Sequence, residues 1–343
     1  MTTEPSFLAI VVPVLNEEQY IRPCLESLLA QAGVDACEIL VLDGGSVDST
    51  AEVVAEMAAS HSCIRLVPNP RRTQAAAVNL AARIAAPQAT VLIRADAHAL
   101  YPSDFVRNCL RAMEATAACS VVTPMRAVGQ HGFQRAVAAA QNGRLGNGGS
   151  LHRTGGPSGF VEHGHHAAFD RRLFLERGGY DESFTHNEDA EYDHRARLAG
   201  GRIWMCGEAV VIYFPRRDIA ALARQYFSHG CGRAGTVLKH RMRPQLRQLA
   251  PVCVLAGTAG GLAGLPLNPW LGAAPAAYLL FCLAWGAAAA ARKRDAWLLA
   301  MGPAAIVMHL SWAAGFVRTC LKGPRSRAER RDITPAVASP RSG

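Results

Sequence analysis

Two long stretches near the C-terminus contain no charged side chain, and they constrain the fold more than any other feature of the sequence. Residues 248–291 and 296–317 contain no Asp, Glu, Lys or Arg, whereas charges before residue 248 are spread as in a water-soluble protein. A helix of about 20 predominantly apolar residues is long enough to span the hydrocarbon core of a bilayer. The sequence therefore predicts a water-soluble N-terminal domain followed by a membrane region.

This pattern predicts four segments. Residues 1–235 form the soluble domain, 236–248 a basic interfacial segment, 249–319 a membrane region of two or three helices, and 320–343 a basic, disordered tail. Within the membrane region, the segments 249–267 and 271–291 are each long enough to span a bilayer, and 296–317 is a third candidate. The alternative is a buried helical core, which an uncharged run as long as 248–291 disfavours.

The net charge of +9 is concentrated beside these apolar runs. Basic residues that flank a span favour the cytoplasmic side and attract anionic lipid, so we expect a membrane surface and not nucleic acid as the partner. The basic flanks around 239–247 and 292–294 predict a hairpin with both ends in the cytoplasm. A third span would place the basic tail outside, so the alternatives for 296–317 are a span, a re-entrant segment or a helix lying flat.

The cysteines and the N-terminus agree with a cytoplasmic soluble domain. None of the ten cysteines sits in a CxxC pair, and scattered thiols suit a reducing compartment. Residues 7–15 are apolar but lack a basic segment before them, so we interpret them as a buried strand, with no export signal. The expected location is a cytoplasmic membrane, with the soluble domain facing the cytoplasm.

The soluble domain reads as alternating strands and helices. Short apolar runs predict strands at 7–15, 38–42, 64–68 and 90–94. Helices are predicted between them: the first at 21–31, the second from just after the turn at 43–46 to about residue 59, and the third at 73–86. Ser46 or Asp48 is expected to cap the second helix. Further helices are predicted at 171–177 and 187–199, and 141–166 is read as a loop over the site. This alternation indicates an α/β fold with a parallel sheet.

Polar residues follow three of the predicted strands, namely Asn16, Asp43 and Asp96. In parallel α/β sheets, ligands bind beyond the carboxyl ends of the strands, so these side chains could converge on one crevice. Asp96 and His98 have the spacing of two metal ligands, although Asp96 could equally cap the next element. Asp43 could accept a hydrogen bond from a base or a ribose, or simply form a turn.

Glu188 and Asp189 open a predicted helix, where carboxylates are favoured by the helix dipole alone. The chemical alternative is a general base, which removes a proton from an attacking hydroxyl group. Six histidines also lie between residues 152 and 194. Their spacing fits no common zinc site, so a polar binding loop is the preferred interpretation. These histidines are His152, His163, His165, His166, His186 and His194.

Five segments in order resemble glycosyltransferase family 2, whose members have the GT-A fold. The resemblance covers residues 7–205, and within the family the chain looks like the bacterial succinoglycan-type exopolysaccharide glucosyltransferases. The matching segments are 11–18 (VVPVLNEE), 41–50 (VLDGGSVDST), 94–98 (RADAH), 178–182 (GGYDE) and 187–189 (NED). The resemblance implies a GT-A domain, a Rossmann-like nucleotide-diphospho-sugar transferase, followed by C-terminal transmembrane helices.

The resemblance also implies a role for each matching residue. Asp189 would be the catalytic base, with Glu188 positioning the acceptor, and Asp96 and His98 would hold the metal. Arg71 and Asn79 fall where the family places pyrophosphate-binding or fold-supporting residues. The implied nucleotide-sugar contacts are Pro13, Asn16, Glu17, Asp43, Arg71, Asn79 and Asp96.

Two departures from the family pattern affect these expectations. Most members have a second Asp where this chain has His98. Imidazole binds manganese better than magnesium, so we expect Mn²⁺ to be preferred over Mg²⁺ as the divalent cation. Gly44 stands where many members have Asp, which removes one nucleotide contact. The Gln-x-x-Arg-Trp motif of processive synthases is absent from the sequence, which favours transfer of a single sugar.

The predicted function is inverting transfer of one hexose, with glucose as the expected sugar, from a UDP-sugar to a lipid-linked saccharide in exopolysaccharide biosynthesis. The expected partners are the UDP-sugar, a polyprenyl-pyrophosphate-linked acceptor, membrane lipid and other polysaccharide assembly proteins. One alternative is a polyprenyl-phosphate sugar synthase. Another is a catalytically silent nucleotide-sugar-binding partner of an assembly complex, which the change to His98 keeps open. A transporter is disfavoured, because at most three spans leave little room for a pathway.

Overall fold

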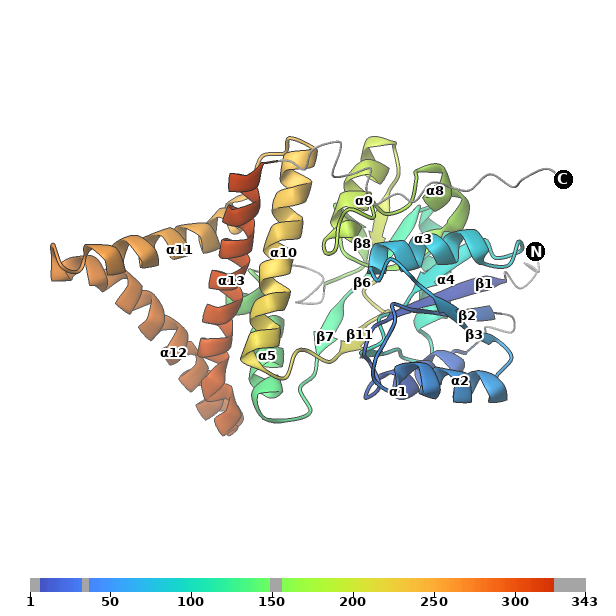
Figure 1. Ribbon diagram of the computed structural model, residues 1–343, viewed down its shortest axis with the longest axis horizontal. Helices are drawn as coiled ribbons and strands as arrows, with labels where there is room; N and C mark the ends of the chain where they lie inside the picture. The colour runs from blue at the N-terminus through green and yellow to red at the C-terminus, as the bar shows by residue number, and fades with distance from the viewer. Residues whose placement is uncertain (1–6, 33–36, 149–155, 324–343) are drawn as a thin grey trace.

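A computed structural model describes residues 7–32, 37–148 and 156–323 of the chain. Its first part consists of four parallel strands joined by three helices (Figure 1). The strands are β1 (Leu8–Val14), β2 (Cys37–Asp43), β3 (Ile64–Pro68) and β4 (Val91–Arg94). The helices are α1 (Ile21–Leu29), α2 (Thr50–Ser60) and α3 (Gln74–Ile84). The predicted elements of this half are confirmed to within a few residues.

The main sheet continues beyond β4 with strands of mixed direction. Its order is β3-β2-β1-β4-β9-β6-β10-β8, and β9 runs antiparallel to both β4 and β6. The added strands are β6 (Ser120–Thr123), β8 (Gly159–Val161), β9 (His165–Asp170) and β10 (Ile203–Met205). A second, smaller sheet has the order β5-β11-β7, formed by Ala99–Leu100, Val211–Tyr213 and Met125–Ala127. All neighbouring strands are therefore parallel in the first half of the sheet, whereas among the described strands of the second half only β6 and β10 form a parallel pair.

Helices cover both faces of the main sheet. Alternate residues of β1 point to opposite sides, so Ile10 and Val12 pack against α1, α2 and α4 (Phe105–Thr116), whereas Ala9 and Val11 pack on the other face. That second face holds α3, α8 (Arg171–Glu176) and α9 (Glu188–Leu198). Because both faces are buried, the strands read as continuous apolar runs in the sequence.

Two predictions about this domain are wrong. Residues 141–166 are not one loop: the described part contains the end of α5 (Gly132–Asn142), the short helix α6 (Arg144–Asn147), β8 and the start of β9. The N-cap of α2 is Ser49, not Ser46 or Asp48. Asp48 nevertheless accepts hydrogen bonds from the backbone and hydroxyl of Thr50.

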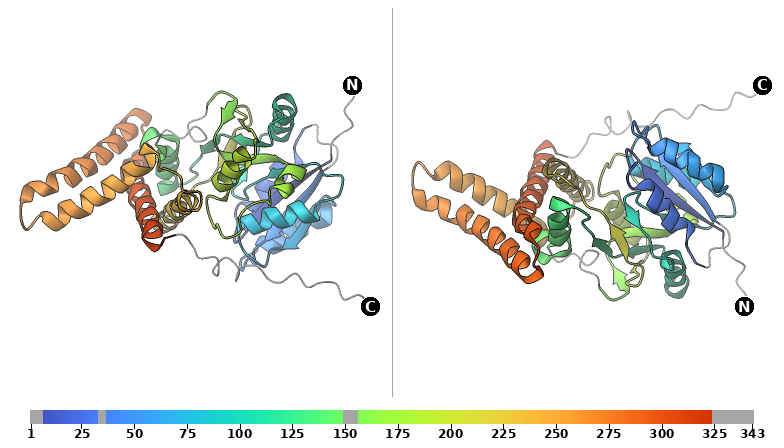
Figure 2. Two further views of the ribbon diagram at one scale, coloured as in Figure 1. Left: turned by 90° about the horizontal axis from the view of Figure 1, so that it is seen from above. Right: turned by 90° about the horizontal axis from the view of Figure 1, so that it is seen from below.

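The C-terminal part is helical and extends away from the sheets (Figure 2). It contains three helical segments long and apolar enough to cross a membrane: Leu246–Gly264, Pro269–Lys293 and Ala296–Lys322. The principal helices are α10 (Ile219–Lys239), α11 (Leu246–Gly264), α12 (Ala273–Lys293) and α13 (Met301–Lys322). The predicted boundary at residue 235 falls inside α10, and the predicted tail lies outside the described residues from 324 onward.

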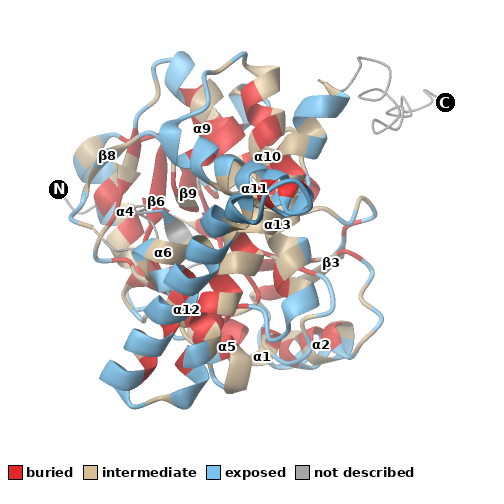
Figure 3. Cartoon of the chain, turned by 90° about the vertical axis from the view of Figure 1, so that its left-hand side faces the viewer, coloured by how far each residue is buried: buried red, intermediate tan, exposed pale blue. Residues whose placement is uncertain are grey.

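The helices α11 and α12 form a hairpin whose surface is largely exposed (Figure 3). Large apolar side chains are exposed on it, including Leu267 at 87%, Trp270 at 82% and Leu280 at 64%. These side chains do not form a buried helical core, which excludes that alternative for the hairpin. Exposed apolar surface of this extent is expected where lipid surrounds a helix pair.

By contrast, α13 lies beside α10 along most of its length and also contacts α5 (Figure 1). Glycines allow the two helices to approach closely. A Cβ atom on Gly230 would lie 2.0 Å from the backbone oxygen of Trp312, and one on Gly315 would lie 2.0 Å from that of Phe227. The C-terminal end of α10 is also tied to the soluble domain, because Lys239 pairs with Asp181 and with the buried Glu191.

Candidate active site

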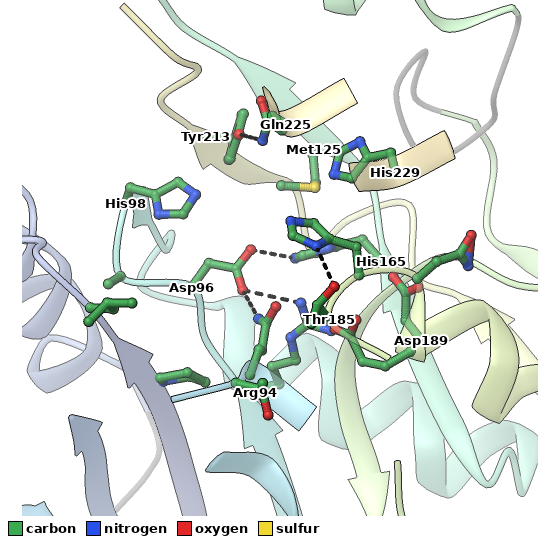
Figure 4. Close-up of a pocket in the computed structure, with 18 of the residues that line it drawn as sticks. Arg94, Asp96, His98, Met125, His165, Thr185, Asp189, Tyr213, Gln225 and His229 are labelled. Atoms are coloured by element: carbon green, nitrogen blue, oxygen red, sulfur yellow. Dashed lines mark hydrogen bonds and ion pairs between the residues drawn. The ribbon is translucent and has the colours of Figure 1, made fainter. Parts of the chain in front are cut away.

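A cavity of about 550 Å³ lies where β1 and β4 end, at the carboxyl edge of the parallel strands. Its walls come from the segments after these two strands, the start of α3, the strand β9, the start of α9 and the inner face of α10. Figure 4 shows Asp96 in this cavity between His98 on one side and Asp189 on the other. Of the predicted site residues, this cavity is lined by Pro13, Asn16, Glu17, Asp96, His98, Glu188 and Asp189.

The loop after β1 is held in place by the loop after β2. Asn16 adopts a left-handed backbone conformation with φ of 58°. Its backbone N–H donates to Ser46 Oγ at 2.9 Å, and its side-chain oxygen accepts from the N–H of Val47 at 2.8 Å. Asp43 accepts from the Ser46 hydroxyl at 2.6 Å and does not line the cavity. In this structure Asp43 shapes the loop that presents Asn16.

Asp96 is a buried carboxylate surrounded by groups that stabilise its charge. Gln74 donates to its Oδ1 at 3.0 Å, and Arg94 and His165 lie 3.4 Å and 3.5 Å from its two oxygens. Burial by itself raises the pKa of Asp96, but the positive charge of Arg94, together with His165 and His98, holds that pKa well below its usual range. Asp96 is thus ionised at neutral pH and suited to a cation.

His98 lies next to Glu17, with its Nδ1 atom 3.0 Å from Glu17 Oε1. Its ring also meets the ring of Tyr213 edge-on at 5.2 Å between centroids. Within the described residues, no group of three or more His, Cys, Asp or Glu side chains is arranged to hold a metal ion. Asp96 and His98 offer an ionised oxygen and an imidazole nitrogen, which fit a divalent ion whose other ligands come from a bound diphosphate.

Glu188 and Asp189 stand at the first turn of α9, after Asn187, which has a left-handed φ of 69°. Glu188 is 3% exposed, and its Oε1 lies 3.6 Å from the guanidinium of Arg94. Burial raises the pKa of Glu188 above its usual range. Burial also acts on Asp189, but there the charges of His166 and Arg94 dominate and lower its pKa. Two adjacent carboxyl groups therefore differ in their tendency to ionise.

Arg71 and Asn79 are placed away from the cavity. Arg71 pairs with Glu182, and Asn79 is buried, donating to the same carboxylate at 2.9 Å and to the backbone oxygen of Tyr180 at 2.8 Å. Asn79 also accepts from the Tyr180 N–H, so it joins α3 to the turn before α9. The sequence predicted either pyrophosphate binding or support of the fold for these two residues, and the contacts seen here are of the second kind. Neither residue lines the cavity, whereas the neighbouring Arg72 does.

The predicted histidine cluster does not form a single site. His165 faces Asp96, His163 lies 3.2 Å from Arg233, and the buried His166 pairs with Asp193 at 2.8 Å. His186 lines the cavity, and the ring of His194 lies 4.5 Å from that of His240, between centroids, in a tilted arrangement. His152 lies outside the described residues.

Several cavity residues were missed by the sequence reasoning. Gln74, at the start of α3, and Arg94, at the end of β4, both contact the carboxylate of Asp96. Gln225, His229 and Arg233 line the cavity from α10, more than 100 residues after β4 in the sequence. Figure 4 shows Gln225 and His229 among them. Arg94 was visible in the matched segment 94–98, but no local pattern marks Gln74.

Comparison with known proteins agrees with this geometry. The family model described as glycosyl transferase family 2 matches residues 9–178. The chain is 42% identical over 313 residues to the succinoglycan biosynthesis protein ExoA of Rhizobium meliloti (strain 1021), covering 91% of this chain and 94% of that protein. A dolichyl N-acetyl-alpha-D-glucosaminyl phosphate 3-beta-D-2,3-diacetamido-2,3-dideoxy-beta-D-glucuronosyltransferase of Methanococcus voltae is 35% identical over 106 residues, which is 30% of this chain and 32% of that protein.

Among solved structures, a mannosyltransferase from Pyrobaculum calidifontis in complex with GDP-Man and Mn²⁺ matches with a TM-score of 0.58 and 23% identity. The match covers 94% of this chain and 88% of that chain, and it confirms the predicted GT-A fold followed by apolar C-terminal helices. Because the family model and the similarity to the Rhizobium protein agree, the chain belongs to glycosyl transferase family 2 and is a glycosyltransferase.

Proposed function

We propose that this glycosyltransferase moves one hexose, with glucose as the expected sugar, from a UDP-sugar to a polyprenyl-pyrophosphate-linked saccharide, with inversion at the anomeric carbon. The observation that carries the proposal is the convergence of Asp189, Asp96 and His98 on one cavity in a member of this family. The name of the Rhizobium relative supports exopolysaccharide assembly of the succinoglycan type as the process served.

Asp189 is proposed as the catalytic base. It lines the cavity, and the nearby charges of His166 and Arg94 outweigh burial and lower its pKa, so the carboxylate is ionised near neutral pH, which is the state that a general base requires. It would remove the proton of an acceptor hydroxyl as that oxygen attacks the anomeric carbon from the face opposite the nucleotide. Glu188, held by Arg94 and more readily protonated, would position the acceptor by hydrogen bonding.

The donor would bind on the opposite side of the cavity. Pro13, near the end of β1, and Asn16 and Glu17, which follow it, would contact the nucleotide, with Asp96 near the ribose and the metal. Asp96 and His98 would hold a divalent cation, with Mn²⁺ favoured over Mg²⁺ because one ligand is an imidazole. When bound, such a cation stabilises the negative charge that develops on the leaving nucleotide. The mannosyltransferase neighbour was solved with Mn²⁺, which supports this choice.

The acceptor is proposed to be held at the cytoplasmic face of the bacterial inner membrane. The hairpin of α11 and α12 would anchor the chain, and a lipid-linked acceptor explains why a transferase of soluble donors needs an anchor. The Methanococcus relative carries a dolichyl-linked sugar phosphate in its name, which supports acceptors of this class. On this view residues 1–235 are the catalytic domain, 236–248 an interfacial segment and 249–319 the membrane region.

The test is donor turnover by the purified protein in detergent. We would supply a panel of UDP- and GDP-sugars, a bacterial lipid extract and Mn²⁺, Mg²⁺ or EDTA, and measure nucleotide release and transfer of label into lipid. Asp189→Asn is expected to lower transfer by about a hundredfold to ten-thousandfold, the range of a lost general base. Asp104→Asn, which removes an exposed carboxylate from the N-cap of α4, is the matched control and should transfer normally.

Two outcomes would contradict the proposal. If Asp189→Asn transferred sugar at the wild-type rate, the base would lie elsewhere in the cavity. If the wild-type protein bound the nucleotide sugar but transferred to no lipid fraction, the chain would be a silent binding partner instead. A product with a single phosphate between lipid and sugar would favour the polyprenyl-phosphate sugar synthase.

A further inference from the structure

A second cavity of about 550 Å³ lies on the membrane side of the catalytic one. We call it the membrane-side cavity; its walls come from α6, from α10 and from the three helical segments that could cross a membrane. It shares His163, His229, Arg233 and Trp312 with the catalytic cavity, so the two cavities adjoin at these side chains. A ligand seated in it would lie directly beside the catalytic cavity.

The lining of this cavity changes from apolar to basic. Toward α11 and α13 it is lined by Ala250, Val254, Met308 and Trp312, which suit a hydrocarbon chain. At the junction with the catalytic cavity stands the guanidinium group of Arg233, and Arg247 lines the membrane-side cavity where it reaches His163, a residue that both cavities share. An apolar end with a cationic end is the complement of a long lipid that carries a phosphate group.

The basic end of the membrane-side cavity, formed by Arg233 and Arg247, is suited to bind an anion. Arg233 and Arg247 approach the same atom, His163 Nε2, at 3.2 Å and 3.4 Å. Among the described residues, no carboxylate lies within ion-pair distance of either arginine, and the negative charges of Asp189 and Glu162 act on Arg233 only from farther away. Burial, and then the charge of Arg233, lowers the pKa of His163 to about 4, so the imidazole is neutral near pH 7 and cannot offset two positive charges. An anion between the two guanidinium groups would relieve their repulsion.

We propose that Arg233 and Arg247 bind the diphosphate of a lipid-linked acceptor, with its hydrocarbon chain in the membrane-side cavity and its saccharide in the catalytic cavity. This inference rests on the proposed function and adds the residues that recognise the acceptor. Arg233 is partly buried on α10 and lies within the electrostatic reach of Asp189. Binding the diphosphate there would place the first sugars of the acceptor beside the proposed base.

The test measures binding and does not require turnover. Full-length protein in phosphatidylcholine nanodiscs would be titrated with a fluorescent polyprenyl diphosphate and with the polyprenol of the same length. Arg247→Gln and Arg233→Gln should each weaken diphosphate binding by about tenfold, since a charge-assisted hydrogen bond is lost, and leave polyprenol binding unchanged. Arg292→Gln, which removes an exposed charge at the end of α12, is the control and should bind within about twofold of wild type.

A second pair of probes separates the lipid from free phosphate. Val254→Trp, two helical turns beyond Arg247 on α11, would fill the apolar end, so it should weaken the polyprenyl diphosphate while leaving a short-chain geranyl diphosphate unaffected. Inorganic pyrophosphate at the same concentration should not displace the long-chain probe, because it makes no contact with the apolar end. Displacement by pyrophosphate alone would identify a free anion site and overturn the proposal.

The outcomes distinguish this inference from the proposed function. If both arginine variants bound the diphosphate as tightly as the wild type, the inference would be wrong even if sugar transfer to lipid were observed. If binding depended on the arginines but no transfer occurred with any donor, the acceptor site would stand and the catalytic proposal would fail. Should Arg233→Gln fold poorly, Arg247→Gln decides the matter, because Arg247 is exposed near the start of α11.

Discussion

At the scale of single residues, the candidate site depends on one buried arginine. Arg94 is 5% exposed and contacts Asp96 at 3.4 Å and Glu188 at 3.6 Å, so one guanidinium joins the proposed metal side of the cavity to the proposed acceptor side. Removing one member of a buried ion-pair network leaves an uncompensated charge, which costs about 3–5 kcal/mol. Arg94 therefore supports the fold as well as the electrostatics of the site.

The choice of metal is decided by one side chain in this proposal, namely His98. His98→Asp would replace an imidazole by a second carboxylate, a ligand that suits Mg²⁺ better. We expect the ratio of transfer rates in Mg²⁺ and in Mn²⁺ to rise by about tenfold, and metal titrations of sugar transfer would measure it. His98→Ala should weaken both metals.

The neighbour of His98 provides the control. Glu17 Oε1 lies 3.0 Å from the imidazole, so a new carboxylate at position 98 would face a like charge until a cation is bound. Dependence on added metal should therefore become steeper in His98→Asp. An unchanged ratio between the two metals would show that His98 is not a metal ligand.

At the scale of elements, the contact between α10 and α13 is set by glycine. Gly315→Ala would put a Cβ atom 2.0 Å from the backbone oxygen of Phe227, and the two helices would have to separate. Overpacking of this kind costs about 1–3 kcal/mol, so the thermal unfolding midpoint of the detergent-solubilised protein should fall. The cavity residues Arg233 and His229 are on α10, so transfer activity should fall as well.

Gly257→Ala is the matched control for this prediction. Gly257 is exposed on α11, and a Cβ atom there would meet nothing within 4 Å. Alanine is favoured over glycine in an exposed helix by about 0.5–1 kcal/mol, so this variant should unfold at the same temperature or slightly higher. Equal effects of the two substitutions would mean that helix propensity, and not the contact of α10 with α13, is responsible.

The elements also show how far the sequence could predict this fold. Strands β1 to β4 and helices α1 to α3 were predicted because burial on both faces of a sheet gives short apolar runs, and the polar residues after the strands mark the site. The antiparallel strand β9 was missed, because its six residues, three of them polar or charged, carry no distinct period. The convergence of α10 on the cavity was also missed, since it depends on contacts with distant residues such as Asp181 and Glu191.

At the scale of the whole molecule, two modes of membrane contact are distinguished. The hairpin of α11 and α12 projects away from the sheets with exposed apolar side chains, whereas α13 packs along α10 and buries residues such as Ala304, Ala305 and Met308 (Figures 1 and 3). Because α10 lines the catalytic cavity, its partner α13 should stay on the same side of the membrane as the active site. The hairpin alone would then cross the bilayer.

The sidedness of three positions tests this arrangement. The exposed thiols Cys253 and Cys320 lie on α11 and near the end of α13, and the first would be replaced by serine so that the natural Cys320 reports on the C-terminal side. We expect an impermeant maleimide to label Cys320 in inverted membrane vesicles but not in intact spheroplasts.

Two engineered cysteines provide the controls. Asn268→Cys, at the tip of the hairpin and made with both exposed thiols replaced, should give the opposite result. Arg294→Cys, in the same background, should behave like Cys320, because the basic residues 292–294 favour the cytoplasm. Labelling of Cys320 from outside would show that α13 crosses the membrane, and its packing against α10 would then have to occur within the bilayer.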